Sequence, residues 1–273
     1  MNLITLSIIM LGTIGAVGSI ILYFVSQAFH VEEDPRIGLV QEALPAVNCG
    51  GCGYPGCSGF ADACVKAENL DDLLCPVGGV ETMKKIAEIL GKTVQGKDPL
   101  IAVVRCNGSC ENRPRTNIYE GAHSCAVSSL LCSGDTACSY GCLGHGDCVT
   151  ACPFDAIYIN SASLLPEVDE EKCTSCGNCI KACPKMLIQL RKKGPESRRI
   201  YVSCMNKEKG AVAKKACSTA CIACSKCQKV CDFEAITIQD NLAYIDDNKC
   251  RVCRKCVSEC PTSSIKYINP ILI

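Results

Sequence analysis

The sequence has no tryptophan, and aromatic residues make up only 5% of its 273 positions. Large aromatic side chains supply much of the buried area in ordinary cores, so we expect thin hydrophobic cores. Histidine is also scarce: His30, His123 and His145 are too few and too scattered for a catalytic set, and we interpret them as ordinary loop residues. No glycine-rich dinucleotide or phosphate loop follows a strand-like segment. These absences argue against chemistry on substrate bonds and against a nucleotide site in this chain.

A charge excess of either sign is missing as well. Lys and Arg number 28, as do Asp and Glu, so the formal net charge is zero. Nucleic-acid affinity depends on basic surface that neutralises phosphates. The composition therefore predicts no nucleic-acid partner.

What the chain has in abundance is cysteine, with 27 residues gathered in tight groups. Neighbouring Cys-x2-Cys pairs are poorly placed for structural disulfides, whose partners need a suitable Cα separation. The same spacing suits metal ligation. Because the thiols must be free when a metal centre is assembled, we expect the cysteine-rich body to lie in a reducing compartment, and we expect metal binding to supply much of the folding free energy.

The run from Cys173 to Pro184 has the spacing C-x2-C-x2-C-x3-C-P, which is typical of bacterial ferredoxins. Three close thiolates bind one four-iron cluster, and the fourth cysteine reaches the cluster of a second run. The run beginning at Cys138 is a looser version, with C-x3-C-x5-C-x3-C spacing, and in the run beginning at Cys221 Asp232 replaces the usual proline. Crosswise ligation predicts four sets: Cys138, Cys142, Cys148 and Cys183; Cys173, Cys176, Cys179 and Cys152; Cys221, Cys224, Cys227 and Cys260; Cys250, Cys253, Cys256 and Cys231.

A further motif precedes these runs, with C-x2-C-x4-C-x17-C spacing and glycines between its first cysteines: Cys49, Cys52, Cys57 and Cys75. Four cysteines also suit a structural zinc ion, but the neighbouring runs favour iron–sulfur. The twenty cysteines at four per cluster predict about five 4Fe-4S clusters. Seven cysteines are left without an assigned role: Cys64, Cys106, Cys110, Cys125, Cys132, Cys204 and Cys217. We expect Cys64 to be a buried helix residue, and a further centre at Cys106, Cys110 and Cys125 stays open.

The N-terminal segment is apolar. Leu3 to Val25 is a run of 23 residues without a charge, long enough to span a bilayer as a helix. Gly12, Gly15 and Gly18 recur every third residue and could form a packing face. A secretory signal peptide is the alternative, but no Lys or Arg precedes the run and its length is unusual for one. We expect a retained single-pass anchor with the C-terminal body in the cytoplasm.

The order of motifs is specific: an apolar helix, Asp34-Pro35, Leu44-Pro45, the segment from Asn48 to Cys57, and then paired ferredoxin runs. This order resembles the B subunit of the Rnf membrane complex over essentially the whole chain. The resemblance implies membership of an ion-translocating ferredoxin:NAD+ oxidoreductase, coupled to Na+ or H+, in the cell membrane. It implies soluble ferredoxin as a partner, together with membrane, flavin-bearing and NADH-binding subunits. It assigns the cluster of the small N-terminal domain to Cys49, Cys52, Cys57 and Cys75.

We predict an α+β protein with an N-terminal transmembrane helix, a small helical iron–sulfur domain and two tandem bacterial-type ferredoxin-like modules. The expected bounds are 1–28, 29–95, 96–194 and 195–273. A strand-like segment precedes both Cys106 and Cys204, which indicates a duplicated unit. The basic segment Arg191 to Arg199 is expected to be a solvated linker or a docking patch for an acidic ferredoxin.

Two other functions stay open. One is the electron-relay subunit of another membrane oxidoreductase, of the hydrogenase or formate dehydrogenase type. The other is a zinc-binding interaction protein. For the electron path, our hypothesis is that the C-terminal modules receive electrons and that the Cys49–Cys75 cluster passes them on.

Overall fold

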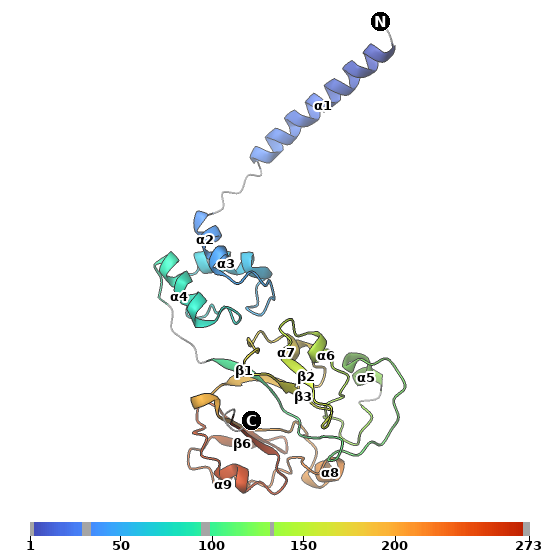
Figure 1. Cartoon of the computed structure of the whole chain (residues 1–273), viewed down its shortest axis with the longest axis vertical. Helices are drawn as coiled ribbons and strands as arrows, with labels where there is room; N and C mark the ends of the chain where they lie inside the picture. The colour runs from blue at the N-terminus through green and yellow to red at the C-terminus, as the bar shows by residue number, and fades with distance from the viewer. Residues whose placement is uncertain (1–2, 29–33, 94–98, 132–133, 270–273) are drawn as a thin grey trace.

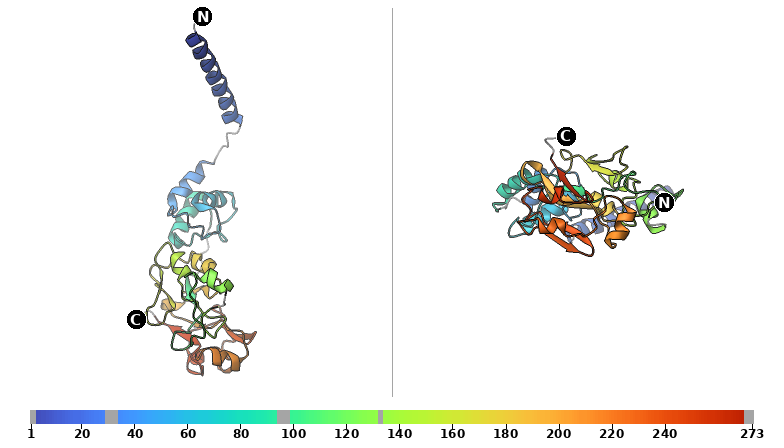
Figure 2. Two further views of the ribbon diagram at one scale, coloured as in Figure 1. Left: turned by 90° about the vertical axis from the view of Figure 1, so that its right-hand side faces the viewer. Right: turned by 90° about the horizontal axis from the view of Figure 1, so that it is seen from below.

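The computed structural model describes residues 3–28, 34–93, 99–131 and 134–269. His30 and Cys132 therefore lie outside the described residues. Figures 1 and 2 show an elongated molecule in which the N-terminal helix, a helical domain and two strand-containing modules follow one another along the long axis. The helix, the helical domain and the two modules therefore follow one another in space in the order in which they occur in the sequence.

Helix α1 (Leu3–Ala28) is continuous over 26 residues and contains no acidic or basic residue. Its stretch Met10–Gln27 is long and apolar enough to cross a membrane, and none of it is buried against the rest of the chain. A Cβ atom at Gly12, Gly15 or Gly18 would meet nothing within 4 Å. The large apolar side chains of α1 that are described are exposed, which is compatible with a helix that spans a membrane.

The helical domain consists of α2 (Pro35–Ala43), α3 (Gly56–Lys66) and α4 (Gly79–Leu90). Asp34 caps α2 by accepting a hydrogen bond from the backbone N–H of Arg36 at 2.9 Å, and Pro35 occupies the first helical position. The three helices enclose a small core that includes Val40, Phe60 and Met83. The core is thin, as the composition predicts, and Phe60 is its one phenylalanine among the described residues.

The first module pairs its first and last strands. Strand β1 (Leu100–Val104) is antiparallel to β4 (Ile188–Lys192), and β2 (Ile157–Ile159) is antiparallel to β3 (Pro166–Val168). The second module repeats this topology, with β5 (Arg199–Val202) against β8 (Ile265–Ile268) and β6 (Ile236–Gln239) against β7 (Leu242–Ile245). The duplication predicted from the two strand–cysteine segments is confirmed by this shared pairing, because β1 and β5 occupy equivalent positions.

Short helices complete both modules, and most of them lie within or beside the cysteine runs. The first module contains α5 (Cys125–Leu131), α6 (Asp147–Thr150) and α7 (Asn178–Ala182). The second contains α8 (Gly210–Ala216), α9 (Lys226–Lys229) and α10 (Lys255–Ser258), and the 3-10 turn η1 (Pro195–Ser197) joins the two modules. Helix α5 is not predicted from the sequence, and it carries one of the unassigned cysteines.

The basic segment between the modules holds them together. Arg191 is only 3% exposed and pairs with Asp247 of the second module at 2.6 Å, while Arg199 pairs with Glu170 of the first module. Both guanidinium groups cross from one module to the other. The expectation of a solvated linker or a docking patch is therefore wrong for Arg191 and Arg199, because carboxylates of the opposite module pair with these buried charges.

Candidate metal centres

In the helical domain the cysteine motif forms a glycine-rich loop that leads into α3. Gly50, Gly53 and Gly56 adopt positive φ angles of 66°, 87° and 81°, which residues with a Cβ rarely adopt. Backbone N–H groups point at sulfur: that of Gly51 lies 3.5 Å from Cys49 Sγ, and that of Gly78 lies 3.3 Å from Cys75 Sγ. Burial raises the pKa of the Cys75 thiol, the N–H groups of Gly78 and Val77 lower it, and the nearby thiols of Cys52 and Cys57 raise it further. Cys52, Cys57 and Cys75 therefore lie near one another at the core of this domain, and Cys49 begins the loop that leads to them.

Cys64 belongs to the core of this domain and is fully buried in α3. Burial raises the pKa of its thiol to about 11. The prediction that Cys64 is a buried helix residue is confirmed.

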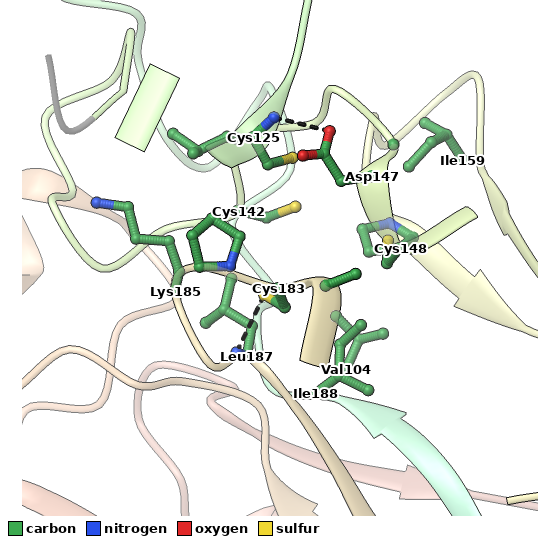
Figure 3. A pocket seen from close by; sticks show the side chains of 15 residues that line it. Val104, Cys125, Cys142, Asp147, Cys148, Ile159, Cys183, Lys185, Leu187 and Ile188 are labelled. Atoms are coloured by element: carbon green, nitrogen blue, oxygen red, sulfur yellow. Dashed lines mark hydrogen bonds between the residues drawn. The ribbon is translucent and has the colours of Figure 1, made fainter. Parts of the chain in front are cut away.

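In the first module four cysteines line one cavity, which we call the Cys142 cavity: Cys125, Cys142, Cys148 and Cys183 (Figure 3). Three of them belong to the predicted set, but Cys125 is present where Cys138 was expected. Asp147 positions Cys125, because its carboxylate accepts hydrogen bonds from the N–H groups of Cys125 at 2.8 Å and Ala126 at 3.0 Å at the start of α5. Asp147, which lies inside the cysteine run, therefore holds the start of α5 so that Cys125 lines the cavity.

The other cavity of this module, which we call the Cys176 cavity, is lined by the predicted crosswise set Cys152, Cys173, Cys176 and Cys179. The backbone N–H of Ala156 lies 3.4 Å from Cys152 Sγ. Burial raises the pKa of Cys179 to about 12, and the neighbouring Cys173 and Cys176 thiols contribute to this rise.

This cavity lies against the helical domain. A Cβ atom at Gly51 would be 2.8 Å from the backbone oxygen of Cys176. The loop of the first motif and the loop of the Cys173 run are therefore in direct backbone contact.

The second module repeats the arrangement. The cavity that we call the Cys224 cavity is lined by the predicted set Cys221, Cys224, Cys227 and Cys260. Burial raises the pKa of Cys256 to about 12, and the nearby thiols of Cys250, Cys227, Cys253 and Cys231 raise it as well. We call the fourth predicted set, which consists of Cys231, Cys250, Cys253 and Cys256, the Cys253 group, and its role as a ligand set stays a prediction.

A fourth cysteine-lined cavity lies at the contact between the modules. This junction cavity is lined by Cys106, Cys138, Cys204 and Cys217. The grouping differs from the prediction, which placed Cys138 with Cys142 and left open a centre at Cys106, Cys110 and Cys125. The equivalent positions of Cys106 and Cys204 after paired strands are the signal that could have indicated it.

Cys110 does not join these groups. It is exposed and donates from its thiol to the carbonyl oxygen of Ala162 at 3.4 Å. It lines a wider cleft together with His123 and His145, whose rings lie 5.8 Å apart. Neither histidine lines any of the four cysteine cavities.

The donor chemistry of these sites fits iron–sulfur clusters. Within the described parts of the chain, no three His, Cys, Asp or Glu side chains gather closely enough to hold one metal ion. The sulfurs instead surround cavities, which suits a multi-atom cluster better than a tetrahedral zinc ion with bonds of about 2.3 Å. Burial raises the pKa of Cys142 to about 12 and that of Cys148 to about 11. Without iron these sites thus favour neutral thiols, and bound iron would supply the positive charge that stabilises the thiolates.

A repeated backbone contact supports this chemistry. The N–H four residues after Cys152, Cys183 and Cys260 points at the respective sulfur at 3.3–3.4 Å. In each case a Cys-Pro turn precedes the donor. Hydrogen bonds to cysteine sulfur are one of the means by which a protein sets the potential of a cluster.

Three family models match parts of the chain. Residues 44–77 match a family described as "Putative Fe-S cluster". Residues 135–184 and 220–264 match two families that are each described as a 4Fe-4S dicluster domain. The chain therefore contains three Fe–S segments in an α+β fold with an apolar N-terminal helix.

Curated relatives match nearly the whole chain. The B subunit of the Na+-translocating ferredoxin:NAD+ oxidoreductase complex of Acetobacterium woodii is 44% identical over 97% of this chain and 78% of the relative. The B subunit of the proton-translocating ferredoxin:NAD+ oxidoreductase complex of Clostridium ljungdahlii is 38% identical over 98% of this chain and 94% of the relative. The B subunit of the ion-translocating oxidoreductase complex of Methanosarcina acetivorans is 38% identical over 95% of this chain and 97% of the relative.

Proposed function

The chain belongs to the Rnf-type B-subunit family of ion-translocating ferredoxin:NAD+ oxidoreductase complexes, and we propose that it is the membrane-anchored component that accepts electrons from reduced ferredoxin. The observation that carries the proposal is the set of cysteine-lined cavities in the two modules, together with the four-cysteine motif of the helical domain that lies between these modules and α1. Iron–sulfur clusters at these sites would supply one-electron chemistry without breaking substrate bonds. The chain would hold, orient and insulate them.

We assign the ligands of five 4Fe-4S clusters from these groupings. The sets are Cys49, Cys52, Cys57 and Cys75; Cys152, Cys173, Cys176 and Cys179; Cys125, Cys142, Cys148 and Cys183; Cys221, Cys224, Cys227 and Cys260; Cys231, Cys250, Cys253 and Cys256. In this assignment Cys125 replaces Cys138 as a ligand beside Cys142. Cys138 remains a ligand candidate at a different cavity.

Two features of the structure support our proposal for the path of electrons. The backbone contact between Gly51 and Cys176 brings the cluster site of the helical domain next to the Cys176 cavity. The second module lies at the end of the molecule that is farthest from α1 (Figure 2). We propose that electrons enter at the C-terminal modules and leave through the Cys49–Cys75 site toward the membrane. If a Cys52→Ala variant prevented ferredoxin from reducing the C-terminal clusters, the order would be reversed.

Family membership and helix α1 support our proposals for the partners and the location of the chain. We propose that NAD+ and flavin bind to other subunits of the complex, because this sequence has no motif for either. Helix α1 would cross the cell membrane once, with the cluster domains on the cytoplasmic side.

Two other functions are less well supported. A relay subunit of a hydrogenase or formate dehydrogenase would also carry ferredoxin modules, but the relatives that match nearly the full chain are B subunits of ferredoxin:NAD+ oxidoreductases. Recovery of flavin-bearing subunits with the chain from solubilised membranes distinguishes the two. A zinc protein would be colourless, and the cavities between sulfurs do not favour it.

The test of the function uses the full-length chain, purified anaerobically in detergent and mixed with a reduced two-cluster bacterial ferredoxin. We expect the visible absorption of the chain's clusters to be bleached as they accept electrons. If dithionite bleached the clusters but reduced ferredoxin did not, ferredoxin would not be the donor and the proposal would fail.

The ligand role of Cys125 has its own test. A Cys125→Ala variant is expected to lose about one four-iron cluster, or to convert it to a three-iron form, because one sulfur of the Cys142 cavity is missing. Iron analysis and electron paramagnetic resonance of the anaerobic protein measure this. Cys110→Ala is the matched control, since Cys110 is an exposed cysteine of the same module outside the cavities. Equal iron content in both variants would remove Cys125 from the ligand set.

A further inference from the structure

We propose that Cys106, Cys138, Cys204 and Cys217 bind a sixth iron–sulfur cluster in the junction cavity, and that this cluster connects the electron paths of the two modules. Its role as a connection rests on the proposed electron-relay function. Its existence does not, because iron binding at four cysteines can be measured without any electron donor.

The four cysteines form a complete donor set. All are buried, with exposed fractions between 6% and 9%, and all line the same cavity. Cys106 follows β1 and Cys204 follows β5, while Cys217 ends α8 and Cys138 lies in the loop before α6. Two sulfurs therefore come from each side of the module contact, and four thiolates are the number that a 4Fe-4S cluster needs. The dicluster families match residues 135–184 and 220–264, so three of these four cysteines lie outside every matched segment.

The surroundings of the sulfurs resemble those of the five proposed sites. Asn206 is 1% exposed, and its backbone N–H lies 3.5 Å from Cys204 Sγ while its side-chain amide lies 3.5 Å from Cys138 Sγ. One buried residue thus points donors at two sulfurs, one in each module. At Gly108 a Cβ atom would be 3.3 Å from Cys217 Sγ, so glycine allows the backbone to approach this sulfur closely.

Buried positive charge also lines the cavity. Arg105 is 3% exposed, and its hydrogen bonds go to the carbonyl oxygens of Val202 and Cys204 and to the amide oxygen of Gln189. Arg113 is 8% exposed, and its Nε has no hydrogen-bond partner among the described residues. Buried guanidinium groups need compensating negative charge. A four-iron cluster with four thiolates has a net charge of about −2 when oxidised, and it would supply that compensation.

The junction cavity is packed against a site in each module. Cys106 packs in the same hydrophobic core as Cys142 and Cys148 of the Cys142 cavity. Cys204 and Cys217 pack in a second hydrophobic core, together with Cys221 and Cys227 of the Cys224 cavity. A centre here would place a redox group between the cluster sites of the two modules. A cluster held by Cys106, Cys138, Cys204 and Cys217 would accept one electron from a reduced neighbouring cluster and pass it to the next cluster, with no bond made or broken.

The first measurement is iron and acid-labile sulfide per full-length chain after anaerobic purification. Six clusters predict about 24 of each, whereas five predict about 20. This count uses the unmodified protein, so it does not depend on the folding of a variant. A value of about 20 would overturn the proposal even if ferredoxin reduced the chain, and a value of about 24 would support it even if ferredoxin did not.

The second measurement uses Cys204→Ala and Cys217→Ala, with Cys110→Ala as the matched control. Each of the two variants is expected to lose about four irons or to show a three-iron signal, while the control keeps the full count. After rapid mixing of these variants with reduced ferredoxin, we expect the clusters of one module to be reduced while the clusters of the other module stay oxidised. Unchanged iron content and spectra in both variants would overturn the assignment.

Discussion

Replacing Asp247 by alanine is expected to destabilise the contact between the two modules by about 3–5 kcal/mol, because it leaves a buried guanidinium without its carboxylate. Arg191 is 3% exposed and donates to Asp247 Oδ1 at 2.6 Å, and it also donates to the carbonyl oxygen of Ile245. Asp247 Oδ2 accepts from the backbone N–H of Lys192 at 3.2 Å. The substitution therefore removes the carboxylate that pairs with the buried Arg191 guanidinium. It also removes the acceptor for the backbone N–H of Lys192 at the end of β4.

The measurement is an unfolding titration of the anaerobic protein with the denaturant guanidinium chloride. Its midpoint is the concentration at which half of the cluster absorption and half of the far-ultraviolet circular dichroism are lost. Asp240→Ala is the matched control, since Asp240 pairs with Lys207 at 3.2 Å on the surface, where an ion pair contributes less than about 1 kcal/mol. The double variant Arg191→Met, Asp247→Ala should recover much of the loss because it removes the buried charge itself. Equal midpoints for Asp247→Ala and Asp240→Ala would contradict the role of this ion pair.

Replacing Gly51 by alanine is expected to separate the helical domain from the first module. The new Cβ would lie 2.8 Å from the oxygen and 2.9 Å from the Cα of Cys176, both of which are backbone atoms that do not yield easily. Overpacking of this kind opposes close contact by roughly 1–3 kcal/mol. The Cys49–Cys75 site would then move away from the Cys176 cavity, and electron transfer to it would become slower while each site keeps its four sulfurs.

Rapid mixing with reduced ferredoxin under anaerobic conditions measures this change. We expect normal iron content, normal reduction of the clusters in the modules, and delayed reduction of the Cys49–Cys75 cluster. Gly38→Ala is the matched control, because a Cβ at this exposed position of α2 meets nothing within 4 Å. Unchanged kinetics in Gly51→Ala would show that the contact with Cys176 does not lie on the electron path.

The two large effects have a common origin in the stacking of domains. The Arg191–Asp247 pair fixes one module on the other, and the contact of Gly51 with Cys176 fixes the helical domain on the first module. Both contacts involve loops that also carry cysteine runs or their flanking residues. The spacing between cluster sites is therefore set by the same contacts that hold the domains together.

Local patterns were sufficient for much of the fold. The charge-free run that begins at Leu3 predicts α1, and the strand-like segments before Cys106 and Cys204 predict two modules of equal topology. Helix α5 was missed because it is seven residues long and depends on Asp147, which caps it from a later part of the chain. The buried state of Arg191 and Arg199 was also missed. A basic segment resembles a solvated linker until its carboxylate partners, which are distant in the sequence, are known.

The sequence by itself predicted the groups in which successive cysteines lie three residues apart, such as Cys173, Cys176 and Cys179. In the run from Cys173 to Cys179 the cysteines are three residues apart, so the local turn alone can bring their sulfurs to one cluster. The proline after Cys183 turns the chain, so that the Cys183 sulfur can reach the neighbouring cluster. Only the tertiary structure decided the places of five cysteines: Cys106, Cys125, Cys138, Cys204 and Cys217. These cysteines are single, or belong to a run with wide spacing, and their partners depend on strand pairing and on the contact between modules. Chain connectivity constrains near neighbours strongly and distant ones only weakly, so distant sulfurs meet only where packing brings them together.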